Sequence, residues 1–151
     1  MTDVLAFDWG TTMVGVLDVQ TGIYTPYRGV EKSIEGATRI LSAEGVIVSF
    51  NGTACDLPKL FELLKLDQSE QVIGATHDDM LLITSNARWP SDAGTGSIKG
   101  PGLIATYKYY LGSNVPVAPE GLTDEYEVSN WRDCHMTAAL WKKWKRGELA
   151  E

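Results

Sequence analysis

Three short apolar runs separated by tight turns open the chain and constrain its fold more than any other feature. Val4 to Trp9 is mostly apolar and stops at Gly10; Val14 to Val19 and Ile23 to Arg28 follow after short turns. Connections this short join neighbouring antiparallel strands. The beginning of the chain is therefore predicted to form a three-stranded antiparallel sheet.

The following segments alternate between helix and strand patterns. Apolar residues spaced three to four positions apart predict a helix over 33–43, and the continuous apolar run 46–50 is typical of a strand buried on both faces. Further helices are predicted over 57–66, 103–111 and 130–145, and a further strand over 71–75. The polar, glycine-rich segment 85–102 is expected to be a mobile or substrate-facing loop. This order predicts an α/β fold with a mixed sheet flanked by helices.

Length and charge restrict the possible classes of protein. A chain of 151 residues has room for about one domain. It contains no run of roughly 20 apolar residues and no basic N-terminal segment before an apolar block, so a soluble, cytoplasmic protein without a membrane partner is expected. The net charge of −7 argues against broad electrostatic capture of long nucleic acid duplexes.

Two minor features have simple interpretations. Cys55 and Cys134 lack metal-ligand spacing and are expected to be buried thiols in a reducing compartment. The basic residues of segment 142–146 could face a nucleic acid backbone, or could be a solvated helix end whose positive charge complements the helix dipole.

The segment AFDWGTTM, residues 6–13, resembles elements of two protein families. DWGTT followed by an apolar strand is similar to the phosphate-binding hairpin of the sugar kinase, actin and chaperone superfamily. In such a hairpin Gly10 allows a phosphate to approach the backbone, and the hydroxyls of Thr11 and Thr12 donate hydrogen bonds. That superfamily holds its nucleotide between two lobes, and the length of this chain counts against it.

The second resemblance is to the DEDD family of 3′–5′ exonucleases, and it runs through nearly the whole chain in order. FDWGTT (7–12) is similar to the family motif F-D-x-E-T-T, and FNGTACDLPKL (50–60) to F-N-G-x-x-F-D-L-P-x-L. NWRDCHMTAAL (130–140) is similar to the third motif, N-x-x-D-x-x-x-T-x-x-L. DDMLLI (78–83) and SIKGPGLIATYKYYLG (97–112) resemble the segments between the motifs.

This resemblance implies a ribonuclease H-like domain over 1–151 that hydrolyses phosphodiesters with metal ions. Asp8, Asp56 and Asp133 are the implied catalytic residues and ligands for Mg²⁺ or Mn²⁺, because hard ions prefer carboxylate oxygens and activate water at neutral pH. The implied substrate is a single-stranded nucleic acid end or a short oligonucleotide. Candidate substrate-binding residues are Trp9, Thr11, Thr12, Asn51 and Trp131, the two tryptophans as stacking platforms or, alternatively, as core residues.

Each aspartate also has a structural interpretation. Asp56 could cap the following helix, Asp133 could be an acid in a first helical turn, and Asp8 could be the polar end of a strand. Considered together and in order, the three favour a shared metal site.

The chain departs from the family pattern at two places. Gly10 stands where the family has glutamate, and Ser129 and Val128 stand where it has a tyrosine or histidine before the last aspartate. Neither Tyr126 nor His135 is at that spacing. These departures imply reduced activity or loss of activity.

Other carboxylates are weaker replacements for the missing glutamate. A hairpin closed by GTTM pairs Asp18 with Leu5, roughly 10 Å along the strand from Asp8, which is too far for joint coordination. Asp78 and Asp79 are looser possibilities.

Two alternative functions remain open. An inactive relative could persist as a binding or inhibitory module whose acidic surface contacts a basic protein partner, and a phosphate hairpin could bind a nucleotide. The small size and reduced catalytic set would suit a protein encoded by a phage or mobile element.

Overall fold

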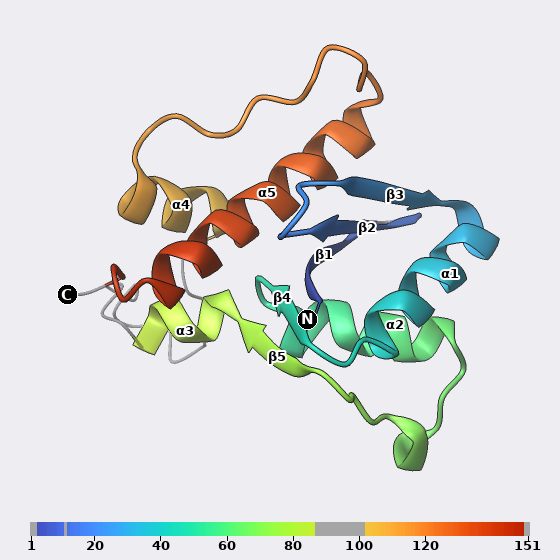
Figure 1. Cartoon of the computed structure of the whole chain (residues 1–151). Helices are drawn as coiled ribbons and strands as arrows, with labels where there is room; N and C mark the ends of the chain where they lie inside the picture. The colour runs from blue at the N-terminus through green and yellow to red at the C-terminus, as the bar shows by residue number, and fades with distance from the viewer. Residues whose placement is uncertain (1–2, 11, 87–101, 150–151) are drawn as a thin grey trace.

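Five strands form one mixed sheet in the computed structural model, which describes residues 3–10, 12–86 and 102–149 (Figure 1). The order across the sheet is β3-β2-β1-β4-β5. The strands are β1 (Val4–Gly10), β2 (Met13–Asp18), β3 (Tyr24–Arg28), β4 (Val46–Ser49) and β5 (Thr76–Asp79). β1, β2 and β3 pair antiparallel, whereas β4 is parallel to β1 and β5 is parallel to β4. The predicted α/β class and the antiparallel opening are confirmed.

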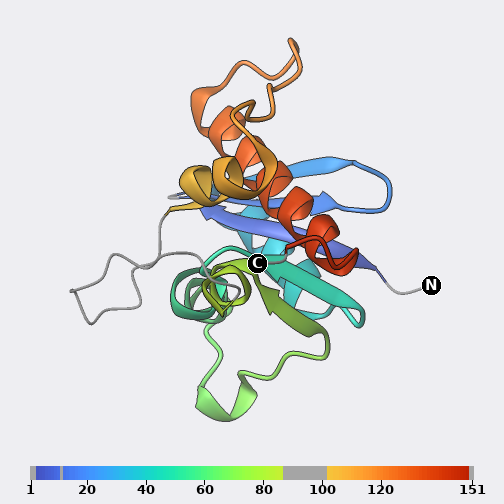
Figure 2. The same ribbon diagram turned by 90° about the vertical axis from the view of Figure 1, so that its left-hand side faces the viewer.

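Helices cover both faces of this sheet. α1 (Gly29–Leu41) and α2 (Leu57–Leu63) lie on one face, and α5 (Glu125–Lys145) crosses the other, beside α3 (Met80–Asn86) and α4 (Leu103–Leu111) (Figures 1 and 2). A π-helical turn, η1 (Gly52–Asp56), precedes α2, and a 3-10 turn, η2 (Gln68–Glu70), follows it. Every helix within the described residues is too short or too polar to cross a lipid bilayer.

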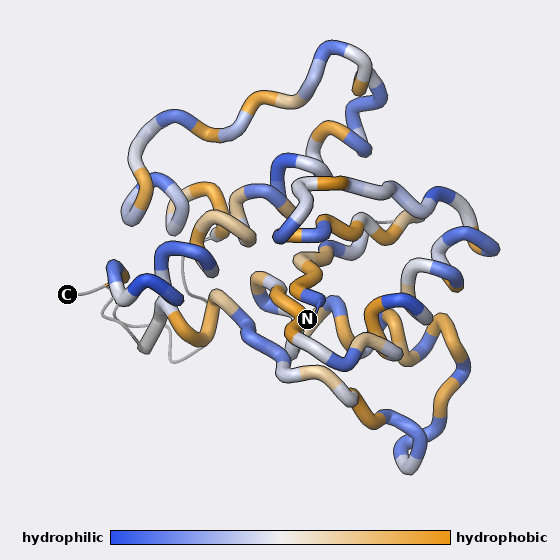
Figure 3. Tube along the Cα trace, in the orientation of Figure 1, coloured by the Kyte–Doolittle hydropathy of each residue, from blue (hydrophilic) through white to orange (hydrophobic). Residues whose placement is uncertain are grey.

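The alternation of side chains along β1 divides the core into two layers. Leu5 and Phe7 belong to the core under α1 and α2, and Val4 and Ala6 belong to the core under α5. The hydropathy-coloured trace shows apolar residues concentrated along these central strands (Figure 3). The same alternation sends Asp8 towards α5 and Trp9 towards α1 and α2.

The predicted strand over 71–75 is wrong, because the strand is β5, with the sequence THDD. Ile73 packs against the core from outside the sheet, while Val72 is exposed. Backbone pairing with β4, in which Ser49 lies opposite Asp79, places the polar residues of β5 in the sheet. The apolar pattern of the sequence does not predict this pairing. Because of this pairing, Asp79 lies at the end of β5, next to the start of η1.

Two helices begin earlier than predicted, and two end earlier. α1 covers 29–41 rather than 33–43, and its first turn is exposed to solvent. α5 begins at 125 rather than 130, because Asp124 caps it. The predicted helix over 57–66 ends at 63. The helix over 103–111 is confirmed. Of the predicted loop 85–102, the first two residues belong to α3 and residues 87–101 lie outside the described part of the chain.

The cysteine prediction is half correct. Cys134 lies on the buried face of α5, but Cys55 is exposed on η1.

Candidate carboxylate site

Three segments bring Asp8, Asp56 and Asp133 to one edge of the sheet. Asp8 lies near the C-terminal end of β1, Asp56 is the last residue of η1 after the neighbouring parallel strand, and Asp133 is on α5. The C-terminal ends of parallel strands meet at the same edge, so residues on and just after them converge. The carboxyl groups lie close enough for their charges to interact.

Burial and mutual repulsion disfavour the charged forms of these three groups. Burial, followed by the nearby charges of Asp79 and Asp133, raises the pKa of Asp56 to about 7, although the backbone N–H of Trp9 partly offsets this. Desolvation, together with Asp56 and Asp133, raises the pKa of Asp8 well above its ordinary value. Burial also raises the pKa of Asp133, and the neighbouring Arg132 opposes this increase. Burial therefore favours the neutral form of each of these carboxyl groups relative to a solvated aspartate.

The structural interpretations of Asp56 and Asp133 do not account for their positions. Asp56 has helical backbone angles and no side-chain capping bond; its Oδ2 accepts a hydrogen bond from the Trp9 backbone at 3.4 Å instead. Asp133 lies eight residues after the first residue of α5, well beyond the first turn. Both carboxyls are directed to the edge of the sheet rather than to the end of a helix.

Asn130 fixes the carboxylate of Asp8. Its Nδ2 donates to the Oδ2 of Asp8 at 3.2 Å and to the backbone oxygen of Asp8 at 3.1 Å, and its Oδ1 accepts a hydrogen bond from the Tyr24 hydroxyl at 2.8 Å. Gly15 pairs with Asp8 across the sheet and leaves the space that Asn130 occupies, because a Cβ there would overlap Oδ1 of Asn130. Tyr24, Asn130 and Asp8 thus form one polar chain from β3 to β1.

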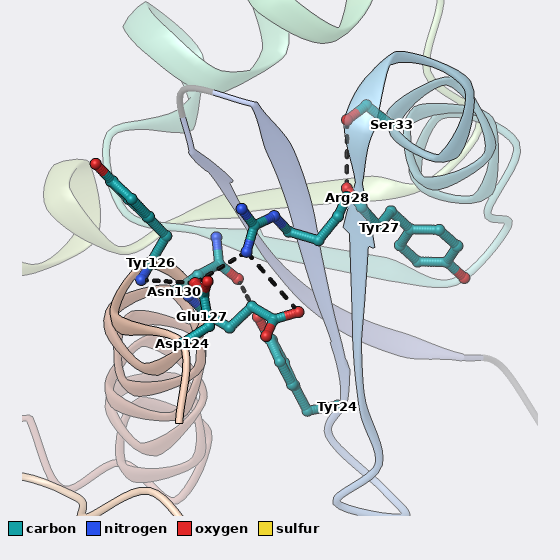
Figure 4. A network of polar contacts seen from close by, with 8 residues as sticks. All are labelled: Tyr24, Tyr27, Arg28, Ser33, Asp124, Tyr126, Glu127 and Asn130. Carbon is teal, nitrogen blue, oxygen red and sulfur yellow. Dashed lines mark hydrogen bonds and ion pairs between the residues drawn. The ribbon is translucent and has the colours of Figure 1, made fainter. Parts of the chain in front are cut away.

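The start of α5 is attached to β3 by a second set of polar contacts (Figure 4). The carboxylate of Asp124 accepts hydrogen bonds from the backbone N–H groups of Tyr126 and Glu127, and Arg28 donates to the same carboxylate at 2.9 Å. These contacts set the position of the helix that carries Asn130 and Asp133.

A cavity of about 220 Å³ opens between β1 and the first half of α5. It is lined by Asp8, Trp9, Gly10, Thr12, Met13, Tyr126, Ser129, Asn130 and Asp133. Tyr126 precedes Asp133 by seven residues, so the two share one face of the helix, and the tyrosine ring extends away from the Arg28 network (Figure 4). Asp56 adjoins this cavity through its hydrogen bond to Trp9.

Tyr126 is the cavity residue that the sequence prediction excluded. A helix starting at 130 would have left it outside, whereas the actual helix includes it. The sequence does contain a pattern that indicates the earlier helix start. Asp124 can accept hydrogen bonds at the helix start, and the acidic residue Glu127 follows three positions later.

Of the other predicted substrate-binding residues, some line the cavity and some do not. Trp9 and the exposed Thr12 line the cavity, and Thr11 lies outside the described residues. Asn51 adopts a left-handed backbone with φ of 67°, and its side chain donates to Cys55 Sγ. Trp131 stacks on His135 with ring centroids 4.0 Å apart and does not line the cavity.

His135 is positioned by Trp131 rather than by the carboxyl groups. Burial and the nearby Lys142 lower the pKa of His135, so its ring favours the neutral form. His135 is not among the residues that line the cavity.

The remaining acidic candidates already have partners. Asp79 accepts hydrogen bonds from the backbone N–H groups of Asn51, Thr53 and Leu81, so it holds η1 in place. Asp78 accepts one from the Trp141 indole at 2.9 Å. Asp18 pairs with Leu5, as predicted, and accepts hydrogen bonds within its own turn.

The basic segment 142–146 makes local contacts at the end of α5. Lys145 lies over the rings of Trp141 and Trp144, Lys143 donates to the backbone oxygen of Tyr110, and Arg146 pairs with Glu148. These contacts favour the solvated helix end over a nucleic acid contact.

The carboxylate site suits a divalent ion in its donor chemistry but is not a closed cage. Within the described residues, no three side chains of His, Cys, Asp or Glu are arranged to hold a metal ion together. Mg²⁺ usually retains several waters and takes only one or two carboxylates together with substrate phosphate oxygens. One or two of the three carboxyl groups could therefore serve as ligands to such an ion.

No protein-family model, curated protein or solved structure matches this chain.

Proposed function

We propose that this chain is a metal-dependent phosphodiesterase of the 3′–5′ exonuclease type, with a ribonuclease H-like fold and reduced activity. Its substrates would be single-stranded nucleic acid ends or short oligonucleotides. The observation that supports this most directly is the convergence of Asp8, Asp56 and Asp133, whose charged forms are mutually unfavourable. Bound protons or a bound cation reduce the electrostatic repulsion within such a cluster of carboxylates.

Each residue has a defined part in this proposal. Asp8, Asp56 and Asp133 would hold Mg²⁺ or Mn²⁺, which when bound supplies an activated water and stabilises charge on the leaving oxygen. Asn130 orients Asp8, and the Trp9 backbone orients Asp56. The cavity beside Tyr126 would admit the terminal nucleotide.

Titration with MnCl₂ at pH 7.5, followed by calorimetry, tests the metal site. Wild type is expected to bind Mn²⁺, and Asp8→Asn, Asp56→Asn and Asp133→Asn are each expected to weaken binding by at least about 100-fold, because each removes an anionic ligand. Asp18→Asn is the matched control: it removes one negative charge from the same hairpin but retains the oxygen that accepts hydrogen bonds from Gln20 and Thr21.

Hydrolysis is tested with a 5′-labelled single strand in MnCl₂ and in EDTA. The expected result is progressive shortening from the 3′ end that EDTA abolishes and that the three active-site variants lose. Absence of Mn²⁺ binding in wild type would refute the proposal. Binding of Mn²⁺ with no shortening would support the second function below.

A binding module without catalytic activity is favoured by one observation. Gly10 lacks the family's carboxylate, and a Cβ added there would lie 2.9 Å from Cγ of Met13, whose side chain is buried. A glutamate at this position would require Met13 to move. The local packing is therefore built around the absence of that carboxylate.

A further inference from the structure

A second cavity, of about 430 Å³, lies between α1 and α2, on the opposite face of β1 from Asp8. Trp9 contributes to it from β1, Val30 and Ile34 from α1, and Lys59, Leu63 and Lys65 from α2 and the turn that ends it. We call this cavity the Trp9 groove. It combines an aromatic side chain, aliphatic walls and positive charge.

The Trp9 groove and the cavity of the carboxylate site share one lining residue. Trp9 lines both cavities, and its backbone N–H donates to the carboxylate of Asp56. Trp9 is therefore the residue through which a ligand in the groove would be placed relative to Asp56.

The walls of the groove are left uncovered. Val30 is 72% exposed and Ile34 is 38% exposed, although both lie directly beside a partly buried tryptophan. Apolar surface of this kind gains free energy when a flat aromatic ligand covers it.

Positive charge lies at the rim in a chain whose net charge is −7. Lys59 and Lys65 are both exposed, and within the described residues neither forms an ion pair. Glu62 lies on the same rim and offsets part of this charge. The two lysines are available to contact phosphate groups.

Lys65 occupies a backbone conformation that favours glycine. Its φ is 55°, and the N–H groups of Lys65 and Leu66 close the end of α2 by donating to the backbone oxygens of Glu62 and Phe61. Helices that end in this way usually have glycine at the left-handed position. A lysine there is a local backbone strain, and strained residues of this kind cluster at binding sites.

We propose that the Trp9 groove binds an unpaired nucleobase of a single-stranded oligonucleotide, stacked on Trp9, with the flanking phosphates against Lys59 and Lys65. Aromatic platforms bind bases of any sequence, and lysines follow the backbone. This inference rests on the proposed function, because the bound base belongs to the nucleotide that precedes the phosphodiester held at Asp8, Asp56 and Asp133.

Fluorescence anisotropy with fluorescein-labelled pentathymidylate in EDTA measures binding without hydrolysis. Lys65→Gly is expected to raise the Kd about fivefold, and Ile34→Glu about tenfold, because the first removes a phosphate contact and the second places a carboxylate in the groove. Lys65→Gly should also raise the Tm by about 2 °C, since it relieves the left-handed strain. Lys32→Ala, an exposed lysine of α1 outside the groove, should change the Kd less than about twofold.

A mononucleotide ester, thymidine 5′-(p-nitrophenyl phosphate), separates the groove from the carboxylate site because it has no second base. Its hydrolysis in MnCl₂ should be lost in Asp8→Asn, and Lys32→Ala, which lies outside both cavities, should hydrolyse it like wild type. One outcome separates the two proposals: wild type binds pentathymidylate, the groove variants bind it more weakly, and neither substrate is hydrolysed. That outcome would support nucleobase binding in the Trp9 groove and refute the proposed hydrolytic function. If wild type shows no binding, or both groove variants bind like wild type, the inference is overturned.

Discussion

At the scale of single residues, the site depends on a glycine and an asparagine from distant parts of the chain. Gly15 provides the space, and Asn130 fills it while donating to the carboxylate and backbone of Asp8. The motif pattern N-x-x-D includes Asn130, but nothing in the local sequence indicates that Gly15 is its partner, because 115 positions separate them in the sequence (130 − 15). Their pairing is a tertiary contact.

Gly15→Ala should lower the free energy of unfolding by about 2–3 kcal/mol, because the added methyl group displaces Asn130 and breaks its hydrogen bonds. Urea unfolding followed by circular dichroism measures the change. Gly121→Ala is the control, since a Cβ there meets no atom within 4 Å, and a change within about 0.5 kcal/mol is expected. Equal stability of the two variants would contradict the role assigned to Gly15.

At the scale of elements, the start of α5 determines which side chains reach the carboxylate site. The apolar periodicity places the helix over 130–145, whereas capping by Asp124 extends it to 125 and brings Tyr126 onto the face of Asp133. Hydrophobic periodicity identifies the buried part of a helix, but its polar first turn is stabilised by backbone hydrogen bonds and has no apolar signal. The same limitation explains the early start of α1.

Asp124→Ala should destabilise the protein by about 1 kcal/mol, because the N–H groups of Tyr126 and Glu127 lose their acceptor. Asp124→Ser separates the cap from the ion pair with Arg28: it retains an oxygen acceptor and removes the charge. Since the ion pair is exposed, the serine variant should remain within about 0.5 kcal/mol of wild type in urea unfolding. A loss as large in the serine variant as in the alanine variant would assign the stability to the ion pair instead.

For the strand β5, apolar patterning selected the wrong segment. The apolar segment 71–75 has the composition of a strand but packs beside the sheet, while THDD pairs with β4. Backbone pairing does not require apolar side chains at the edge of a sheet, so composition alone selects the wrong segment. The correct register matters for the site because it positions Asp79 to hold η1.

At the scale of the whole molecule, the buried acidic groups link stability to pH. The folded pKa of Asp56, about 7, exceeds the value near 4 that an unfolded aspartate has, so the folded state binds more protons between these pH values. Stability contributed by protonated Asp56 is therefore present at low pH and is lost as the pH rises towards 7. The lowered pKa values of His77 and His135 act in the opposite direction, because folding disfavours their charged forms as the pH falls.

Comparison with Asp56→Asn isolates the contribution of Asp56. In EDTA, the stability of the variant relative to wild type should increase as the pH rises from 5 to 8, reaching roughly 2–4 kcal/mol at the upper end. Asparagine retains an oxygen that can accept from Trp9, so the difference reports charge rather than the lost hydrogen bond. Thermal unfolding over this pH range provides the measurement, and a difference independent of pH would contradict the raised pKa.

The sequence by itself determined the α/β class, the antiparallel opening and the central parallel strand, because these depend on short-range turn chemistry and apolar patterning. The three aspartates were implied by the resemblance to the exonuclease motifs. The metal site and its activity remain predictions. Only the tertiary structure decided that Asn130 and Gly15 orient Asp8, that Tyr126 lines the cavity, and that Trp9 lines two cavities on opposite faces of β1. These contacts form when folding brings segments that are distant in the sequence together on the sheet. A local sequence pattern does not predict the distances between such segments.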